Sequence, residues 1–116
     1  KDRHMRQETQ KIMSAFLKGE SASAQRTNTD GHNVWLHGNL IAQRSEGDYV
    51  DFSLAGWPTV TTRDRVNGLL QLSGSDYRVF QKNGTQFLTN GKDVREIGDS
   101  EWIGLNDEAH KDRVSV

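Results

Sequence analysis

The residue pair Asn83-Gly84 places the strongest constraint on how this chain can fold. Asparagine and glycine are the residues that most readily adopt the two positive φ angles of a type I′ turn. The pair lies between YRVFQK and TQFLT, which both have the composition of β-strands. We therefore predict a β-hairpin at this point, and with it an antiparallel sheet in this part of the chain.

A second set of strands is predicted from residue 33 onward. The segments NVWLH and LIAQR flank a break at Gly38-Asn39, which indicates a further hairpin, and YVDFSL resumes an alternating pattern after the SEGD turn. The segment EWIGL brings Trp102 and Ile103 back as a short closing strand or as part of the core. The predicted fold class is α+β, with a small antiparallel β-sheet of about five strands that contains two hairpins.

Two helices accompany this sheet. Residues 8–18 have apolar side chains on one helical face, followed by Gly19 where a C-terminal cap belongs, so we predict an amphipathic helix that covers one side of the sheet. A helix that detaches to bind a partner is the alternative. Residues 19–32 have no apolar period and are predicted to form a loop. The apolar face of the first helix consists of Ile12, Met13, Phe16 and Leu17.

The second helix is predicted between the third and fourth strands, in the segment AGWPTVTTRDRVNGLL. Proline cannot donate a hydrogen bond to a sheet, so Pro58 ends the preceding strand. Thr61 is the expected N-cap, with Thr62 as the alternative, and residues 63–70 are expected to form a helix of about two turns. Asn67-Gly68 is expected to loosen the end of this helix.

The same segment holds a candidate binding site. In one interpretation Trp57 supplies an aromatic surface beside Arg63 and Arg65, whose guanidinium groups suit phosphate or carboxylate. Asn67 adds an outward amide to this surface. In the other interpretation Trp57 belongs to the core, and the arginines are solvated or pair with Asp64. A core position is favoured for Trp57, and at least one of the two arginines is expected to be structural.

The composition argues against several classes of protein. A chain of 116 residues, of which 33% are apolar, is long enough for one domain with a modest core. Its net charge of −1 argues against a general nucleic-acid or membrane-surface binder. The absence of cysteine excludes disulfides, thiolate metal sites and thiol nucleophiles. Since no apolar run is long enough to span a bilayer, we expect no membrane contact and a cytoplasmic location.

No catalytic or metal-binding constellation is visible in the sequence. His32 and His37 have a spacing that does not place both imidazoles on one strand face, and no motif supplies a third ligand. The serines lack a nucleophile-elbow context, and no glycine-rich phosphate-binding loop precedes a helix. We therefore expect no metal, no cofactor and no enzymatic activity.

The same patterns predict the domain boundaries. Residues 1–4 resemble the remnant of an expression tag, with the natural start at Met5. A single α+β domain is predicted over residues 5–105, with its sheet-rich core in residues 33–105. Residues 106–116 are predicted to be a flexible charged tail.

Three ordered motifs resemble a family of short proteins encoded largely by bacteriophages. They are LHGNLIA at residues 36–42, AGWPTVTTRDRVNGL at residues 55–69 and VFQKNGTQFL at residues 79–88. Val66 stands where this family usually has leucine, a change that bears on packing. The resemblance implies a phage origin but no particular activity. The family's polar pattern includes Asn39, Trp57, Arg63, Arg65 and Asn67.

Three functions fit these features. The first is a phage accessory protein that binds and modulates a host protein, in agreement with the near-neutral charge and the small size. The second is a module for single-stranded DNA or RNA that uses Trp57, Arg63 and Arg65 together with the hairpin around Asn83-Gly84. The third is a structural or self-assembling component of the virion. Further nucleic-acid contacts would come from Arg44, Tyr77, Arg78 and Lys82.

Overall fold

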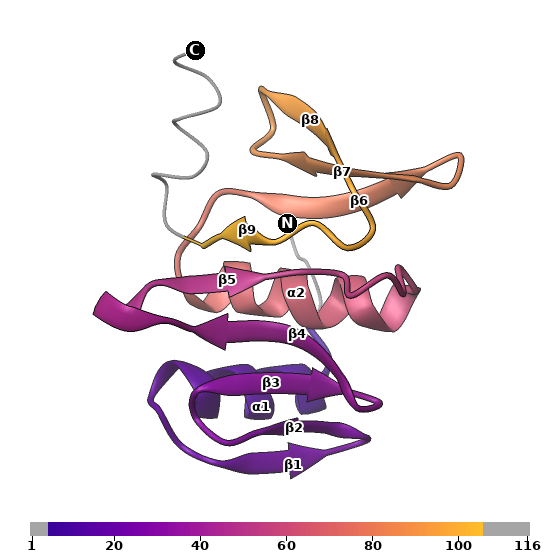
Figure 1. Ribbon diagram of the computed structural model, residues 1–116. Coiled ribbons are helices and arrows are strands. Elements are labelled where there is room, and N and C mark those ends of the chain that lie inside the picture. The colour runs from indigo at the N-terminus through magenta and orange to yellow at the C-terminus, as the bar shows by residue number, and fades with distance from the viewer. Residues whose placement is uncertain (1–4, 106–116) are drawn as a thin grey trace.

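The computed structural model describes residues 5–105, which form two α-helices and two antiparallel sheets (Figure 1). Helix α1 spans Gln7–Leu17, α2 spans Val60–Leu72, and a short 3-10 helix spans Glu46–Asp48. The larger sheet has the order β1-β2-β3-β4-β5-β9, and the smaller one has the order β6-β7-β8. The larger sheet consists of β1 Ala22–Ala24, β2 Thr27–Thr29, β3 Asn33–Leu36, β4 Asn39–Arg44, β5 Val50–Phe52 and β9 Ile103–Gly104. The smaller sheet consists of β6 Arg78–Lys82, β7 Thr85–Thr89 and β8 Val94–Ile97. The expected tag remnant at residues 1–4 and the expected tail at residues 106–116 lie outside the described residues.

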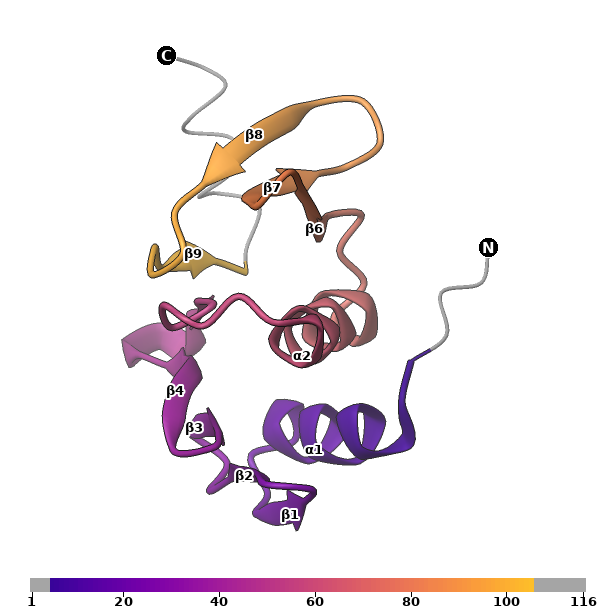
Figure 2. The ribbon, with the colours of Figure 1, turned by 90° about the vertical axis from the view of Figure 1, so that its right-hand side faces the viewer.

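Both α-helices lie on one side of the six-stranded sheet, and the three-stranded sheet lies above α2 (Figure 2). Helix α1 contributes Ile12, Met13 and Phe16 to the core, and all three side chains are 0% exposed. Such burial supplies the apolar contacts that a short helix needs to be stable. Helix α1 is therefore docked on the sheet, and the alternative of a detached helix is wrong for this structure.

The predicted α+β class with antiparallel pairing is confirmed, whereas the predicted number of strands is wrong. The described residues contain nine strands in two sheets. Beyond the predicted strands, β1 and β2 lie in residues 19–32, which were expected to form a loop, and β8 and β9 follow the β6–β7 hairpin. The buried side chains of β2 are Thr27 and Thr29, so this strand has no apolar alternation in its sequence. The hydroxyl of Thr27 accepts a hydrogen bond from Arg65 and that of Thr29 donates to the carbonyl of Asn33, which allows both to be buried.

The two hairpin turns that the sequence indicated are present. Asn83 and Gly84 have φ angles of 53° and 80°, and Lys82 pairs with Thr85, as the Asn-Gly signal predicts. The earlier turn is displaced by one residue from the predicted Gly38-Asn39. Its central residues are His37 and Gly38, because Asn39 already pairs with Leu36 as the first residue of β4.

The chain uses the same order of elements twice, although no internal repeat is visible in its sequence. Helix α1 is followed by β1, β2 and β3, and α2 is followed by β6, β7 and β8, in each case with a hairpin before the third strand. Each helix is followed by a glycine with positive φ, Gly19 at 76° and Gly74 at 84°. The next amides, of Glu20 and Ser75, donate to carbonyls in the last turn of their helices.

The turn between the second and third strand is also repeated. The hydroxyl of Thr29 accepts from the amide of Gly31 at 3.0 Å and donates to the carbonyl of Asn33 at 2.7 Å. A carboxylate oxygen of Asp30 accepts from the amides of His32 and Asn33. These bonds satisfy the polar groups of a tight turn locally. The second turn has the same bonds at Thr89, Asn90, Gly91, Lys92 and Asp93.

We expect Asp30→Asn to keep this turn, as Asn90 does in the second turn, and to reduce the acid sensitivity of the fold. The amides of His32 and Asn33 lower the pKa of Asp30 below its ordinary value. Such a carboxylate stabilises the fold above its unfolded pKa, and this contribution is lost as the pH falls through the folded pKa. Thermal unfolding at about pH 7 and about pH 3 measures the difference. A greater acid-induced loss in Asp30→Asn than in the wild type would contradict this explanation.

The two helices approach each other closely at Gly68. A Cβ atom on this residue would lie 2.1 Å from Cγ2 of Thr9, which is too close for any real contact. The expectation that Asn67-Gly68 loosens the end of the helix is wrong, because α2 continues to Leu72 and Gly68 lies inside it. The glycine is therefore needed for helix packing.

We predict that Gly68→Ala destabilises the protein by about 1–3 kcal/mol, because the added methyl group overpacks the contact with Thr9. Helix propensity alone gives the opposite sign, a gain of up to about 1 kcal/mol. Urea unfolding decides between the two, with Gln71→Ala at an exposed position of α2 as the control. A stabilised Gly68→Ala would show that the two helices can move apart at little cost.

Candidate functional site

Residues 53–59 carry the chain from β5 to α2 and hold Trp57 at their centre. Ala55 and Gly56 have positive φ angles of 57° and 72°, which reverse the chain after the strand. The Gly56 amide donates to the Asp99 carbonyl at 2.7 Å, and the Trp57 amide donates to the Leu54 carbonyl at 2.9 Å. Backbone hydrogen bonds thus hold this turn in one conformation.

The N-cap of α2 is Thr59, and the predicted caps Thr61 and Thr62 are wrong. The Thr59 hydroxyl accepts from the Thr62 amide at 3.1 Å, and the two hydroxyl groups lie 3.0 Å apart. Thr59 follows Pro58 and has extended backbone angles, as an N-cap requires. The helix consequently begins at Val60, before the predicted start at residue 63, and extends beyond the predicted end at residue 70.

Trp57 lies on the surface, with 56% of its side chain exposed, so the favoured core position is wrong. The physical reason lies in the turn that surrounds it. Leu54, just before the chain reversal, takes the core position, and α2 resumes contact with the core through Thr62 and Val66. Trp57 therefore lies in the connection between them. Val60, at the start of the helix, is also exposed.

Trp57 lies together with Asn39, the other surface residue of the predicted site. These two residues and His37 line an open hollow. His37 belongs to the β3–β4 turn, and its amide donates to the Arg26 carbonyl at 2.9 Å, which places this turn beside the β1–β2 turn. Asn39 and Trp57 were nominated from the sequence, whereas His37 was considered only as a metal ligand and rejected as one.

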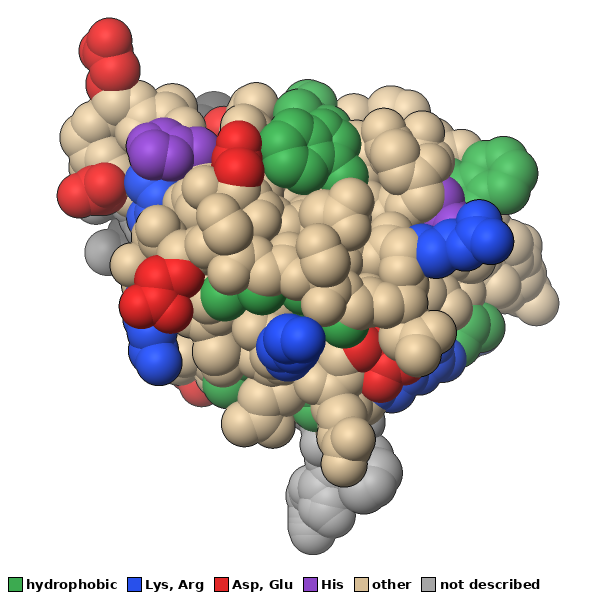
Figure 3. All heavy atoms as spheres, turned by 90° about the horizontal axis from the view of Figure 1, so that it is seen from below, with side chains coloured by type: hydrophobic (Ala, Val, Ile, Leu, Met, Phe, Trp, Pro, Cys, Tyr) green, Lys and Arg blue, Asp and Glu red, His purple; other side chains and the backbone are tan. Residues whose placement is uncertain are grey.

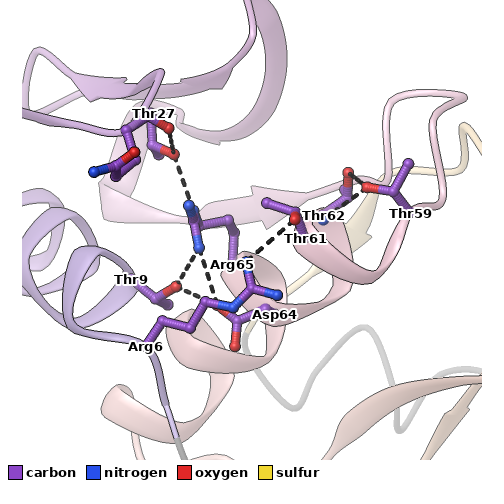
Figure 4. A network of polar contacts seen from close by, with 9 residues as sticks. Arg6, Thr9, Thr27, Thr59, Thr61, Thr62, Asp64 and Arg65 are labelled. Atoms are coloured by element: carbon purple, nitrogen blue, oxygen red, sulfur yellow. Dashed lines mark hydrogen bonds and ion pairs between the residues drawn. The ribbon is translucent and has the colours of Figure 1, made fainter.

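Arg65 is buried, with only 2% of the residue exposed, and cannot form part of an outer recognition surface. Its Nε donates to the Thr27 hydroxyl at 2.9 Å, and its Nη1 donates to the Thr9 hydroxyl at 2.7 Å and to Oδ2 of Asp64 at 3.0 Å (Figure 4). The buried charge is thereby paired and hydrogen-bonded. The expectation that at least one of the two arginines is structural is confirmed by Arg65.

The contacts of Arg65 belong to a wider polar network, which joins β2, α1 and α2 (Figure 4). Thr9 donates a hydrogen bond to the carboxylate of Asp64. Nε of Arg6 lies 3.9 Å from the same carboxylate, and its Nη1 donates to the Thr61 hydroxyl at 3.2 Å. Three polar residues of α2 are therefore engaged with the start of α1, namely Thr61, Asp64 and Arg65.

Asn67 binds the backbone of β6 and not an outside ligand. Its Nδ2 donates to the Val79 carbonyl at 2.9 Å, and the Val79 amide donates to its Oδ1 at 2.7 Å. The side-chain amide thus forms the pair of bonds that a neighbouring strand would form, and it covers part of the edge of β6. The outward orientation predicted for Asn67 is wrong for this reason.

Arg63 makes the second contact between α2 and the β6–β7 hairpin. Its Nη1 donates to the Pro58 carbonyl at 2.8 Å and to the side-chain oxygens of Gln81 at 3.0 Å and Gln86 at 3.3 Å. Arg63 and Asn67 share a flank of the helix as predicted, but this flank faces the hairpin. Of the predicted binding residues, the structure leaves Trp57 and Asn39 together on the surface.

The residues predicted as further nucleic-acid contacts do not all lie on the surface. Arg44 donates to the backbone carbonyls of Phe16 and Gly31, and its guanidinium carbon lies 4.8 Å from the centre of the Phe16 ring. Tyr77 is half-buried. Arg78 and Lys82 are exposed on β6. The predicted set of basic contacts therefore does not form one surface.

Residues 5–105 contain no group of three or more histidine, aspartate or glutamate side chains that could hold a metal ion. Within the same residues, no helix has the length and apolar character needed to cross a bilayer.

The family model described as Kyanoviridae Gp96 protein matches residues 5–108. The chain belongs to this family. The phage origin implied by the three sequence motifs is thereby confirmed. No curated protein and no solved structure matches the chain.

We predict that Arg65→Ala destabilises the fold by about 3 kcal/mol, because it removes the buried donor shared by the carboxylate of Asp64 and the hydroxyls of Thr9 and Thr27. Urea unfolding followed by circular dichroism measures the change. Arg78→Ala removes an exposed arginine and serves as the control, with an expected change within about 0.5 kcal/mol. Equal effects of the two substitutions would mean that the buried network contributes little.

Proposed function

We propose that this chain is a small, non-enzymatic phage accessory protein that acts in the host cytoplasm, where it binds and modulates a host protein through a surface centred on Trp57. The observation that carries this proposal is the exposure of Trp57 at the centre of a hydrogen-bonded turn. Tryptophan is among the residues most enriched at the energetic centres of protein interfaces. An exposed tryptophan with no place in the core therefore favours a binding role.

The surroundings of Trp57 support a protein partner. Val60 adds a second exposed apolar side chain nearby in the chain, whereas His37 and Asn39 add polar groups at the hollow. An apolar centre with polar groups beside it is the usual composition of a protein interface. The turns that carry these residues are fixed by backbone hydrogen bonds, so binding requires little additional ordering.

A nucleic-acid site centred on Trp57 has less support. Arg63 and Arg65 would have to contact phosphate groups, but Arg63 binds the β6–β7 hairpin and Arg65 is buried. On the face seen from below Figure 1, positive and negative side chains are interspersed, without a broad positive area (Figure 3). That face therefore offers no broad positive surface to a phosphate backbone.

We expect Trp57→Ser to lose the host protein while the fold remains intact. Wild-type protein and variants are immobilised, exposed to nuclease-treated host lysate, and the retained protein is then purified and titrated by calorimetry. Loss of an interface tryptophan costs about 2 kcal/mol or more, so Kd should rise roughly 30-fold.

Trp102→Ser is the matched control, because Trp102 is also exposed but lies outside the residues that line the hollow. It should bind like the wild type. Unchanged binding by a folded Trp57→Ser variant would refute the proposed surface, and retention that disappears with nuclease treatment would refute a direct protein partner.

A further inference from the structure

The three-stranded sheet has an aromatic outer face. Phe80 on β6 and Phe87 on β7 are directly opposite each other, and their rings stack with centroids 5.2 Å apart and planes inclined by 21°. Both are half-buried, whereas their strand neighbours Val79 and Leu88 are buried on the opposite face. The stacked rings therefore belong to the side of the sheet that faces away from the core.

Two basic side chains flank this ring pair on the same face of β6. Arg78 and Lys82 are each two residues from Phe80, so each Cα lies about 6.6 Å from that of the phenylalanine along the strand. The Arg78 guanidinium carbon lies 5.5 Å from the centre of the Phe80 ring. We call these four residues, Arg78, Phe80, Lys82 and Phe87, the β6–β7 outer face.

The two basic groups of this face have no carboxylate partner among the described residues. In the described part of the chain, Arg78 and Lys82 form no ion pair, whereas Arg65 pairs with Asp64 and Arg95 pairs with Glu101. Both side chains are exposed. An exposed cation without a carboxylate partner can bind a phosphate without first breaking an ion pair.

We propose that the β6–β7 outer face binds single-stranded nucleic acid. Unpaired bases stack on Phe80 and Phe87, and the phosphate groups on either side contact Arg78 and Lys82. A duplex does not fit this arrangement, because its bases are already stacked and paired. With two phosphate contacts the binding is salt-sensitive and not selective for sequence.

The position of an acidic residue indicates how the strand lies. Glu96 on β8 is the cross-strand neighbour of Phe87, on the side away from β6. Its carboxylate repels phosphate from that side of the sheet. The nucleic-acid backbone is therefore expected along β6, where both basic groups are, with its bases directed toward β7.

This site is separate from the proposed protein-binding surface, and the two can be tested independently. None of the three residues that line the Trp57 hollow belongs to β6 or β7. Trp57→Ser should therefore bind oligonucleotides like the wild type. The failure of one proposal leaves the other intact.

The test is fluorescence anisotropy with labelled oligothymidylate, oligouridylate and a duplex of equal length, at low and at physiological salt. We expect the wild type to bind both single strands and to prefer them to the duplex at low salt. R78Q/K82Q should weaken this binding and reduce the slope of log Kd against log salt by about 1.4, the value for two lost phosphate contacts. F80L/F87L should weaken binding roughly fivefold or more through lost stacking, while leucine still fills the half-buried positions.

K11Q/K18Q is the control, because it removes the same charge from exposed positions in α1 and at its C-cap. It should bind like R78Q/K82Q only if net charge alone decides affinity. Circular dichroism verifies the fold of each variant, and R78Q/K82Q tests the site even if F80L/F87L does not fold. The proposal is overturned if the wild type binds no single strand at low salt, if the control loses as much affinity as R78Q/K82Q, or if the duplex binds as tightly. It is also overturned if F80L/F87L keeps oligonucleotide binding but loses a purified host protein, because the face then serves a protein partner.

Discussion

The fold depends on how one buried charge, the guanidinium of Arg65, is satisfied. Removal of a cation from water is costly unless partners surround it, and the partners of Arg65 come from three separate elements, Thr27 on β2, Thr9 on α1 and Asp64 on α2. The contact with Arg65 explains the buried threonine at position 27 of β2, whereas the hydroxyl of Thr29 bonds to the backbone of the following turn. Apolar packing of α1 and α2 supplies the driving force for folding, and the Arg65 network determines how the two helices and β2 are aligned.

The polar residues of α2 connect the two halves of the molecule. Arg65 reaches toward α1 and the six-stranded sheet, whereas Arg63 and Asn67 reach the β6–β7 hairpin. The helix thus lies between the two sheets with polar contacts to each (Figure 2). Because these residues are engaged internally, the surfaces that we propose for partners are different ones, the turn around Trp57 and the outer face of β6 and β7. Both proposed functions use residues that packing leaves exposed.

Much of the fold could be predicted from short segments. The Asn83-Gly84 turn, the face of α1 with Ile12, Met13 and Phe16, and the hairpin of residues 33–44 were all indicated by residues close together in the chain. The β1–β2 hairpin was missed because its buried threonines carry no apolar signal. Only the structure shows that its turn, Thr29-Asp30-Gly31, has the same hydrogen bonds as Thr89-Asn90-Gly91. At the candidate site, Asn39 and Trp57 were nominated from the sequence and lie together on the surface. Arg63, Arg65 and Asn67 were expected to face outward, but they bind other parts of the protein.

There is a physical reason why some features could be predicted from the sequence and others could not. The sequence alone determined the hairpin at Asn83-Gly84, the α+β class and the apolar face of the first helix, because each depends on backbone preferences and spacings within a few residues. Only the tertiary structure decided which polar side chains are buried and which aromatic ones are exposed. The bonds of Arg65 to Thr27 and Thr9 span 38 and 56 residues of chain, so no local pattern could reveal them. Trp57 is exposed for a related reason, since Leu54 and Val66 occupy the core positions on either side of its turn.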